Sequence, residues 1–319
     1  MKIVLLEPLG IPEESLNQYA EKLEGAGHEF RAYPRDTDPA VQTARAEDAD
    51  VIMLANMPLS GEVIRSCKKL KYIDIAFTGV DHVEISAAKE KGIAVSNAAG
   101  YSTQAVAELT LCMMLSLLRN VPQVEERCRA GQTKDGLIGC ELMGKTVGVV
   151  GTGAIGLRVA ELCRAFGAAV IAYAPRPKEA AAGLVTYVPL EELLSKSDLV
   201  TLHCPLNSES RGLIGAREIA LMKRTAYLVN TARGPVVDAA ALADALNGGR
   251  IAGAAVDVFE TEPPLGTGHP LLHSKNTIVT PHVAFATEES MEARARIVFD
   301  NLWSWMAGSQ KNVILASAE

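Results

Sequence analysis

Three glycines are the first residues whose type and spacing indicate chemistry: Gly151, Gly153 and Gly156 stand in GxGxxG spacing. They lie between an apolar run that predicts a strand and an amphipathic run that predicts a helix. Such a turn lets the backbone approach a pyrophosphate, which would rest on the helix N-terminal amides near Ala154 and Ile155. The alternative is a turn without a ligand, but the strand, helix and second strand around it favour a bound dinucleotide.

The second strand after this turn ends in VIAYAPRP, residues 170–177, where an expected acid is missing. A site for NAD usually carries Asp or Glu about 20 residues past the first glycine, to bond the ribose hydroxyls. This chain has Ala174, Pro175 and Arg176 there. No carboxylate repels a 2′-phosphate, and Arg176 could pair with one, so the sequence favours NADP over NAD. The alternative is that Arg176 points into solvent and both cofactors are accepted.

Four polar residues lie at or just after the ends of predicted strands in the second half of the chain: Arg233, Asp257, Glu262 and His282. Open α/β sheets place ligands at these strand ends. Arg233 could grip the carboxylate of a 2-oxo acid with two parallel hydrogen bonds. His282, in a Thr-Pro-His turn with a carboxylate upstream, is a candidate acid/base. Taken alone, it could equally be a surface histidine or a satisfied core residue.

The elements that must position these residues alternate between strand and helix from the start of the chain. Strands are predicted at 2–7, 28–33, 50–55, 72–77 and 93–97, and helices at 13–24, 40–47, 60–67 and 82–91. After a long helix capped by Ser102 or Thr103, the pattern restarts at Lys145, with strands at 168–173, 198–204, 226–230, 251–259 and 276–280. The sequence therefore predicts an α/β protein with two Rossmann-like, doubly wound parallel-sheet domains.

A last helix is predicted after Thr287, which would cap it, with Glu288 and Glu289 in the first turn. One face of that helix carries Met291, Ala295, Val298, Leu302 and Trp305. An apolar stripe of this kind favours packing against a core rather than a ligand site.

Composition excludes several classes of partner. The 319 residues carry a formal net charge of −7, which argues against nucleic acid and anionic membrane surfaces. The longest apolar run, 105–118, is too short for a membrane span and contains Glu108, and the N-terminus turns acidic too soon for a signal peptide. Six scattered cysteines without CxxC or His/Cys metal spacing predict small buried side chains, no metal site and a cytoplasmic protein.

The chain resembles the D-2-hydroxyacid dehydrogenase family. The motifs that carry the resemblance are GKTVGVVGTGAIG, LHCPLNSESRGLI, NTARGPVVD, AVDVFETEPP and TPHVA, together with GVDHVEISAAKEKGIAVSNAAGYSTQAVAEL. They cover nearly the whole chain and are specific in combination. The resemblance implies a discontinuous, flavodoxin-like substrate domain, 1–99 and 288–319, around a dinucleotide-binding Rossmann domain, 100–287.

The resemblance also implies roles for single residues. Arg233 would bind the substrate carboxylate and carbonyl, His282 would be the acid/base, and Glu262 would pair with the histidine. The cofactor would be held by Asp257 and the Thr231–Ala232 backbone at the nicotinamide, and by His203, Cys204 and Pro205 at the adenine. The substrate carboxylate would meet the backbone of Thr78 and Gly79, and Phe285 would lie near the pocket or pack between the domains.

The implied reaction is hydride transfer from a nicotinamide to C2 of a small 2-oxo acid, giving the D-2-hydroxy acid. Glyoxylate, hydroxypyruvate and pyruvate are the expected substrates. Formate, phosphite or 3-phosphoglycerate, or a corepressor-like role in nucleotide sensing, are the alternatives. The resemblance and the apolar helix 105–118 together predict a homodimer.

Overall fold

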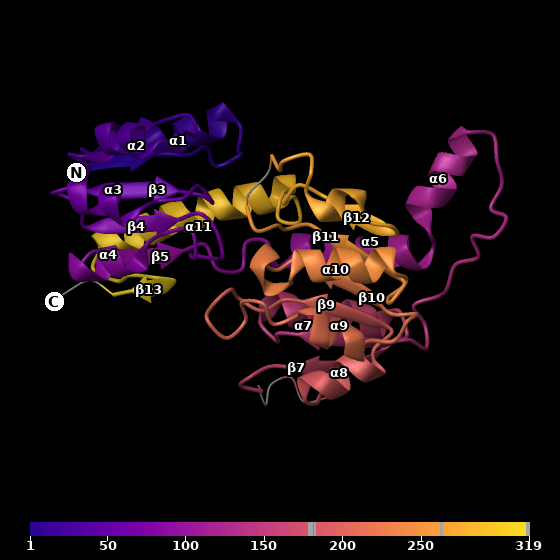
Figure 1. Cartoon of the computed structure of the whole chain (residues 1–319). Helices are drawn as coiled ribbons and strands as arrows, with labels where there is room; N and C mark the ends of the chain where they lie inside the picture. Colours follow the sequence, from indigo (N-terminus) through magenta and orange to yellow (C-terminus); the bar gives the residue numbers. More distant parts are fainter. Residues whose placement is uncertain (178–180, 182, 262–263, 317–319) are drawn as a thin grey trace. The chain divides into compact units, whose positions relative to one another are not determined.

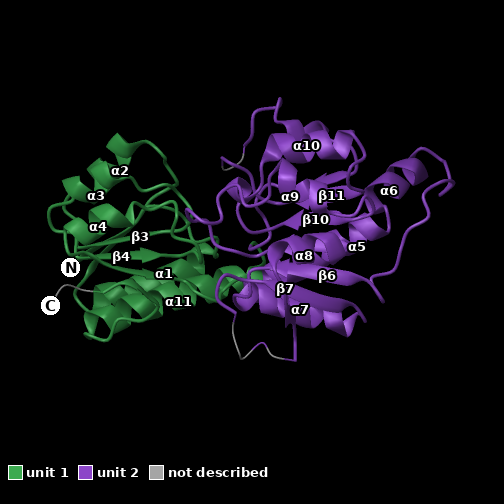
Figure 2. Cartoon of the chain, turned by 60° about the horizontal axis from the view of Figure 1, so that its bottom comes forward, with its two compact units in different colours: residues 1–102, 286–319 green, residues 103–285 purple. Residues whose placement is uncertain are grey.

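The computed structural model describes residues 1–316 apart from 178–180, 182 and 262–263. The chain divides into two compact units (Figure 2): Met1–Ser102 with Ala286–Glu319 form unit 1, and Thr103–Phe285 form unit 2. The units divide at 102/103 and 285/286, and the domain boundaries expected from the sequence are 99/100 and 287/288. Each unit contains its own sheet.

Unit 1 is a six-stranded sheet in the order β13-β5-β4-β3-β1-β2, covered by helices (Figure 1). Its strands are β1 (Lys2–Leu5), β2 (Glu29–Ala32), β3 (Val51–Leu54), β4 (Tyr72–Ile75), β5 (Ala94–Asn97) and β13 (Val313–Leu315). Its helices are α1 (Glu13–Gly25), α2 (Pro39–Ala46), α3 (Gly61–Ser66), α4 (Ile85–Glu90) and α11 (Glu288–Met306). The first five strands are parallel in the order 2-1-3-4-5, which is the flavodoxin-like order that was predicted.

Strand β13 departs from the prediction of a purely parallel sheet, because it pairs with β5 in the antiparallel direction. Ser96 Oγ donates to the Lys311 carbonyl at 2.7 Å, and the Asn97 N–H donates to the Asn312 carbonyl at 3.1 Å. The strand has three residues, too few for an alternating pattern to be visible in the sequence. Parallel sheets commonly carry an antiparallel edge strand of this kind.

Helix α11 begins where the sequence predicts. Thr287 Oγ1 accepts the Ser290 N–H at 3.2 Å and so caps the helix. Ala295, Val298 and Leu302 of the predicted stripe are buried in unit 1. The stripe therefore packs against the core.

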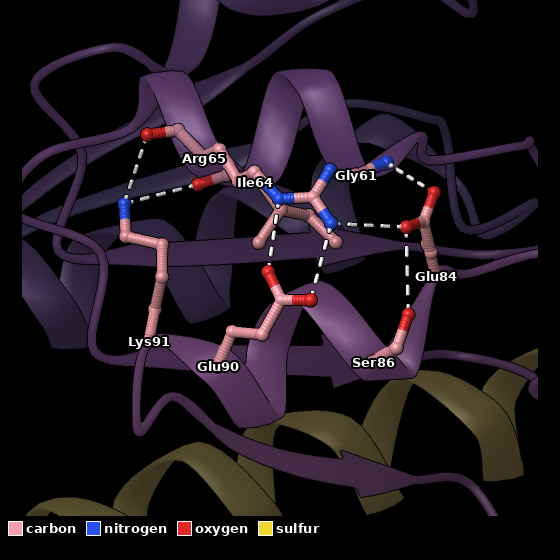
Figure 3. A network of polar contacts seen from close by, with 7 residues as sticks. All are labelled: Gly61, Ile64, Arg65, Glu84, Ser86, Glu90 and Lys91. Atoms are coloured by element: carbon pink, nitrogen blue, oxygen red, sulfur yellow. Dashed lines mark hydrogen bonds and ion pairs between the residues drawn. The ribbon is translucent and has the colours of Figure 1, made fainter.

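A polar network on the surface of unit 1 ties α3 to α4 (Figure 3). Arg65 pairs with Glu90 at 3.0 Å and with Glu84 at 3.3 Å, and Glu84 also accepts the Gly61 N–H at 3.0 Å. A Cβ at Gly61 would lie 2.6 Å from the Glu84 carboxyl group, so a larger residue there would displace this side chain. Lys91 Nζ donates to three carbonyls at the end of α3. The network fixes α4 and the end of the loop that leads into it from β4.

Unit 2 is a seven-stranded parallel sheet in the order β12-β11-β10-β9-β6-β7-β8. Its strands are β6 (Thr146–Val150), β7 (Ala169–Tyr173), β8 (Thr186–Tyr187), β9 (Leu199–Leu202), β10 (Tyr227–Asn230), β11 (Gly253–Val256) and β12 (Thr277–Val279). Its helices are α5 (Thr103–Leu118), α6 (Val121–Arg129), α7 (Ala154–Ala165), α8 (Leu190–Lys196), α9 (Ala216–Leu221) and α10 (Ala239–Asn247), with 3-10 turns η2 (Gly234–Val236) and η3 (Pro270–His273). Counted from β6, the order is the Rossmann order 3-2-1-4-5-6 with one strand added.

Helix α5 contains the apolar run 105–118 and is half buried in the core of unit 2, where it packs on α7. Among the described residues, no single helix is long and apolar enough to cross a membrane. The pair α5 and α6, bent by 63°, passes that test by length and composition only.

The prediction that the cysteines are buried is wrong for half of them. Cys67 and Cys163 are buried and Cys204 is half-buried, but Cys112, Cys128 and Cys140 are exposed. Cys112 lies in the apolar run of α5, and its neighbours gave no sign that this position faces outward, because apolar residues surround that helix on nearly every face.

Candidate active site

The glycine turn joins β6 to α7 and is shaped by contacts that only glycine permits. Gly151 has φ +97°, and a Cβ there would lie 2.7 Å from the backbone of His203 and Cys204. A Cβ at Gly156 would lie 2.0 Å from the Gly151 carbonyl oxygen. A Cβ at Gly153 would meet no atom within 4 Å. The turn therefore packs tightly on one side and is open at Gly153.

The N-terminus of α7 follows the glycine turn directly. Gly153 is its N-cap and provides no side-chain hydrogen bond, so the first amides of the helix receive no cap. These are the amides of Ala154 and Ile155 that the sequence assigns to a pyrophosphate. A pyrophosphate fits this geometry, since a helix N-terminus with free N–H groups favours anions.

A tyrosine that sequence reasoning missed holds the glycine turn. The Tyr187 hydroxyl, from β8, donates to Thr152 Oγ1 at 2.9 Å. Thr152 is the buried residue between the first two glycines of the motif. Strand β8 has two residues and left no periodic signal in the sequence, so only the fold brings Tyr187 to the turn.

Residues 174–176, where the expected acidic residue is missing, follow β7 directly. The Gly151 N–H donates to the Tyr173 carbonyl at 2.8 Å, which sets the end of β7 beside the glycine turn. Ala174 is half-buried, whereas Pro175 and Arg176 are exposed. Among the described residues, Arg176 has no ion-pair partner within 4.0 Å.

His203, Cys204 and Pro205 follow β9 and pack behind the glycine turn. Thr201 Oγ1 lies 2.9 Å from His203 Nε2, and burial lowers the pKa of His203 to about 3. The ring is therefore neutral near pH 7. Burial raises the pKa of the Cys204 thiol to about 11, so that group is also neutral. These three side chains form an uncharged surface, which suits contact with an adenine ring.

Arg233 stands after β10 on a backbone that is held from several sides. The Asn230 side chain accepts the Ala232 N–H at 3.0 Å and donates to the Arg233 carbonyl at 3.0 Å. Gly234 packs on the backbone of Phe259, where an added Cβ would lie 1.9 Å away. Glycine at this position brings the ends of β10 and β11 together and leaves the half-buried Arg233 at that edge.

The segment before Arg233 also has a support that the sequence does not reveal. Thr231 Oγ1 lies 2.9 Å from Thr110 Oγ1 of α5, and both are buried. Helix α5 thus holds the side chain of Thr231. The partners are 121 residues apart, a separation at which no local pattern signals contact.

His282 stands in a tight turn after β12 that Asp257 organises. Its backbone has φ +56°, a left-handed conformation that is uncommon for a residue with a side chain. The fully buried Asp257 accepts the N–H groups of Val283 and Ala284 at 2.9 Å each. Burial raises the pKa of Asp257 despite these hydrogen bonds. The His282 ring lies edge-on to Phe285, with ring centroids 5.3 Å apart.

Glu262 lies outside the described residues, so its pairing with His282 stays a prediction. A different carboxylate of the same loop, Glu260, pairs with His269 at 3.0 Å. No group of three or more His, Cys, Asp or Glu side chains in the described part of the chain is placed to hold a metal ion.

Thr78 and Gly79 lie in unit 1, on the loop that follows β4. In the part of the chain that the structure describes, the amides of Thr78, Gly79 and Val80 donate no hydrogen bond. Three successive backbone N–H groups without partners at the carboxyl edge of a parallel sheet provide donors for an anion.

Comparison with known proteins assigns this arrangement to a family. The family model described as "D-isomer specific 2-hydroxyacid dehydrogenase, NAD binding domain" matches residues 111–284, more than half of the chain. The chain belongs to the D-2-hydroxyacid dehydrogenase family. The match spans the glycine turn, Arg233 and His282.

Other proteins of similar sequence or fold act on different substrates. A glyoxylate reductase of Thermofilum pendens is 37% identical over 306 residues, which are 93% of this chain and 90% of that protein. A D-3-phosphoglycerate dehydrogenase of Methanocaldococcus jannaschii is 42% identical over 276 residues, or 85% of this chain, which spans about half (52%) of that protein's length. The solved structure of an acyclic imino acid reductase (Bsp5) in complex with NADPH and D-Arg has a TM-score of 0.90 at 29% identity, covering 99% of this chain and 100% of that one.

These findings make the chain a dehydrogenase of the D-2-hydroxyacid family with a nicotinamide cofactor. The glycine turn and the uncapped α7 would hold the pyrophosphate. Arg233 and His282 stand at the carboxyl ends of β10 and β12 in the same sheet. This arrangement brings a guanidinium group and an imidazole ring to one edge of unit 2.

Proposed function

We propose that this dehydrogenase reduces a small 2-oxo acid, glyoxylate or hydroxypyruvate in the first place, to the D-2-hydroxy acid. The observation that carries the proposal is the placement of Arg233 and His282 on the sheet edge that also carries the glycine turn. A nicotinamide cofactor supplies the hydride when it is bound.

Arg233 binds the carboxylate and polarises the carbonyl of the acid. Its guanidinium can form two parallel hydrogen bonds to a carboxylate and stabilises negative charge that develops on the carbonyl oxygen. Hydrogen bonds and close packing hold the backbone around Ala232 and Gly234, and Arg233 Nη1 donates to the Ala232 carbonyl at 2.8 Å. These contacts favour one orientation of the guanidinium and therefore of the substrate.

His282 gives a proton from a ring nitrogen to that oxygen as it becomes an alkoxide. Glu262, by the family resemblance, pairs with the ring and favours its protonated form. Asp257 supports this proton transfer indirectly, because its hydrogen bonds fix the turn that carries the His282 ring. In this proposal Asp257 also contacts the nicotinamide.

The amides of Thr78 and Gly79 provide a second set of donors for the substrate carboxylate. Their lack of partners among the described residues supports this role, since free N–H groups in a loop attract anions. Phe285, edge-on to His282, would limit the room beside the reacting carbon. The amides favour an acid, and the limited room favours a small one.

The cofactor of this proposal is NADPH in preference to NADH. Ala174 places no negative charge near the ribose, and Arg176 is not engaged in an ion pair with another described residue. An arginine fork is suited to a phosphate, so the 2′-phosphate of NADPH would gain a partner there.

Turnover with a panel of substrates tests the proposal. Oxidation of NADPH and of NADH is followed by absorbance with glyoxylate, hydroxypyruvate, pyruvate, phosphohydroxypyruvate and an imino acid. We expect the highest kcat/KM with one of the first three and NADPH. Activity confined to phosphohydroxypyruvate or to the imino acid would reject the proposed substrate class.

A homodimer is also part of the proposal, and the segment from α6 onwards supports it. Helix α6 has no buried residue, and it projects with the following loop from the body of unit 2 (Figure 1). Ile138 of that loop is 86% exposed and Met143 is 68% exposed. A second copy could cover these side chains. Light scattering should give twice the chain mass for the wild type and a lower mass for Ile138→Asp; a monomeric wild type at micromolar concentration would reject the dimer.

A cytoplasmic location completes the proposal. All six cysteines are free thiols, and three of them are exposed. A reducing compartment would keep exposed thiols in that state. Fractionation of the source cells tests it, and recovery outside the cytoplasm would reject it.

A further inference from the structure

The loop that carries the free amides is held from inside unit 1 by an asparagine. Asn97 Nδ2, at the end of β5, donates to the Thr78 carbonyl at 2.7 Å. Asn97 is only 7% exposed. A carbonyl oxygen can only accept, so the side-chain nitrogen of Asn97 must face it, and the orientation of this amide is fixed.

This hydrogen bond decides where the next amide points. Thr78 C=O and Gly79 N–H belong to one planar trans peptide, in which the two groups point in opposite directions. Because Asn97 draws the carbonyl toward the interior of the sheet, the Gly79 N–H is turned the other way. The Gly79 amide has no partner among the described residues, so nothing else sets its direction.

Asn97 is in turn held by two more asparagines. Asn301 Nδ2, from α11, donates to the Asn97 carbonyl at 3.0 Å and to Asp74 Oδ1 at 3.2 Å. Asn312 Nδ2 donates to Asn301 Oδ1 at 2.8 Å. Asn301 and Asp74 are buried at 1% and 0% exposure. These hydrogen bonds restrict the motion of Asn301 and of the end of β5, so the support of Thr78 does not depend on an exposed side chain.

We propose that Asn97, supported by Asn301, is a positioning residue that aims the Gly79 amide at the substrate carboxylate. The inference rests on the proposed function, in which that amide binds the acid. Asn97 does not touch the substrate itself. Its removal leaves the Thr78–Gly79 peptide free to rotate and therefore weakens binding of the acid rather than of the cofactor.

The test compares Asn97→Asp with a neighbouring variant of the same strand. Aspartate has the shape of asparagine but, when ionised, cannot donate to the Thr78 carbonyl. Asn97→Ser, whose hydroxyl is too short to reach, is the milder second variant. Ser96→Ala is the matched control, because it removes the hydrogen bonds of the Ser96 hydroxyl to the Lys311 carbonyl and to Gln310 Nε2 without touching Thr78. For each variant, kcat and KM for glyoxylate, the Kd for NADPH and the urea midpoint are measured.

We expect Asn97→Asp and Asn97→Ser to raise KM for glyoxylate about fivefold to tenfold, the effect of one hydrogen bond, with kcat and the NADPH Kd nearly unchanged. Ser96→Ala should lower the urea midpoint to a similar degree and leave KM unchanged. Equal KM values for Asn97→Asp and Ser96→Ala would overturn the inference. A purely structural role of Asn97 would lower stability without separating KM from kcat.

A binding measurement distinguishes this inference from the proposed function. Wild-type protein with ¹⁵N-labelled glycine is titrated with oxalate in the presence of NADP⁺, and the Gly79 amide resonance is followed. We expect a shift in the wild type and a smaller one in Asn97→Ser. If no 2-oxo acid is turned over but Gly79 still shifts in this manner, the proposed reaction fails and the positioning role stands. An unshifted Gly79 in the wild type would overturn the positioning role whatever the variants do.

Discussion

The backbone of His282 is hydrogen-bonded to Asp257, because the His282 N–H donates to the Asp257 carbonyl at 2.7 Å. The Asp257 carboxylate accepts the N–H groups of the next two residues, Val283 and Ala284. Thr280 Oγ1 also donates to this carboxylate, at 2.5 Å. One buried aspartate thus binds four groups of a five-residue turn. The left-handed backbone at His282 persists because these bonds hold it, and the direction of the ring follows from the turn.

Asp257→Asn should therefore weaken both the fold and the reaction. An amide offers one acceptor oxygen in place of two, so one buried N–H of the turn loses its partner. We expect a loss of about 1 to 3 kcal/mol in the free energy of unfolding, measured with urea, and a lower kcat. Asp198→Asn is the control, since Asp198 accepts the Thr146 N–H at the opposite edge of the same sheet. An equal kcat in the two variants would separate Asp257 from catalysis.

Cofactor choice should respond to the segment after β7. Arg176→Ala is expected to weaken the binding of NADPH on the order of tenfold and the binding of NADH little, because only NADPH has a 2′-phosphate for this side chain. Ala174→Asp should favour NADH, through a bond to the ribose hydroxyl and repulsion of the phosphate. Kd values for NADPH and NADH, obtained from cofactor fluorescence, measure the effect of each variant. Arg158→Ala in α7 is the control. Tighter NADH binding by the wild type and no response to Arg176→Ala would contradict the assignment.

Tyr187→Phe should loosen the glycine turn. Loss of the hydroxyl removes the bond to Thr152, and we expect the Kd of NADPH to rise about threefold to tenfold with kcat unchanged at saturating cofactor. Tyr227→Phe is the control, because it removes a hydroxyl from the same sheet that bonds to no described residue. If both variants bind NADPH equally well, Tyr187 has no part in shaping the turn.

His203 should make the protein sensitive to acid. The pKa of His203 is lowered to about 3 in the folded chain, against about 6.5 when unfolded, so between these values the unfolded state binds a proton that the folded state does not. Stability should fall as the pH decreases from about 6.5 toward 3. In His203→Gln, urea unfolding between pH 7 and pH 4 should show a shallower fall. The same slope in both proteins would mean that other groups determine the acid sensitivity.

The sequence predicted the fold well because both sheets are built from a strand-helix alternation that repeats along the chain. The alternation of strands and helices identified β1 to β5, and the restart at Lys145 identified the second sheet. The glycine turn was recognised because Gly151 and Gly156 are required by local contacts. The short strands β8 and β13 were missed, since two or three residues carry no period.

The supports of the candidate site could not be predicted, because they join residues that are distant in the chain. Thr110 reaches Thr231, Tyr187 reaches Thr152, and Asn301 reaches Asn97 across 204 residues. Each bond depends on how two elements pack, which composition and spacing do not reveal. Arg233 and His282 were predicted as site residues because their types and their positions after strands are visible in the sequence.

The central claim, that His282 gives the proton during reduction of a 2-oxo acid, is tested most directly by single-turnover hydride transfer. Enzyme with bound NADPH is mixed with saturating glyoxylate in a stopped-flow instrument, for the wild type and for His282→Asn, whose side chain tolerates the left-handed backbone at this position. We predict a loss on the order of 10²-fold or more in the rate of NADPH oxidation, with an unchanged Kd for NADPH. A variant that transfers hydride at the wild-type rate would contradict the claim.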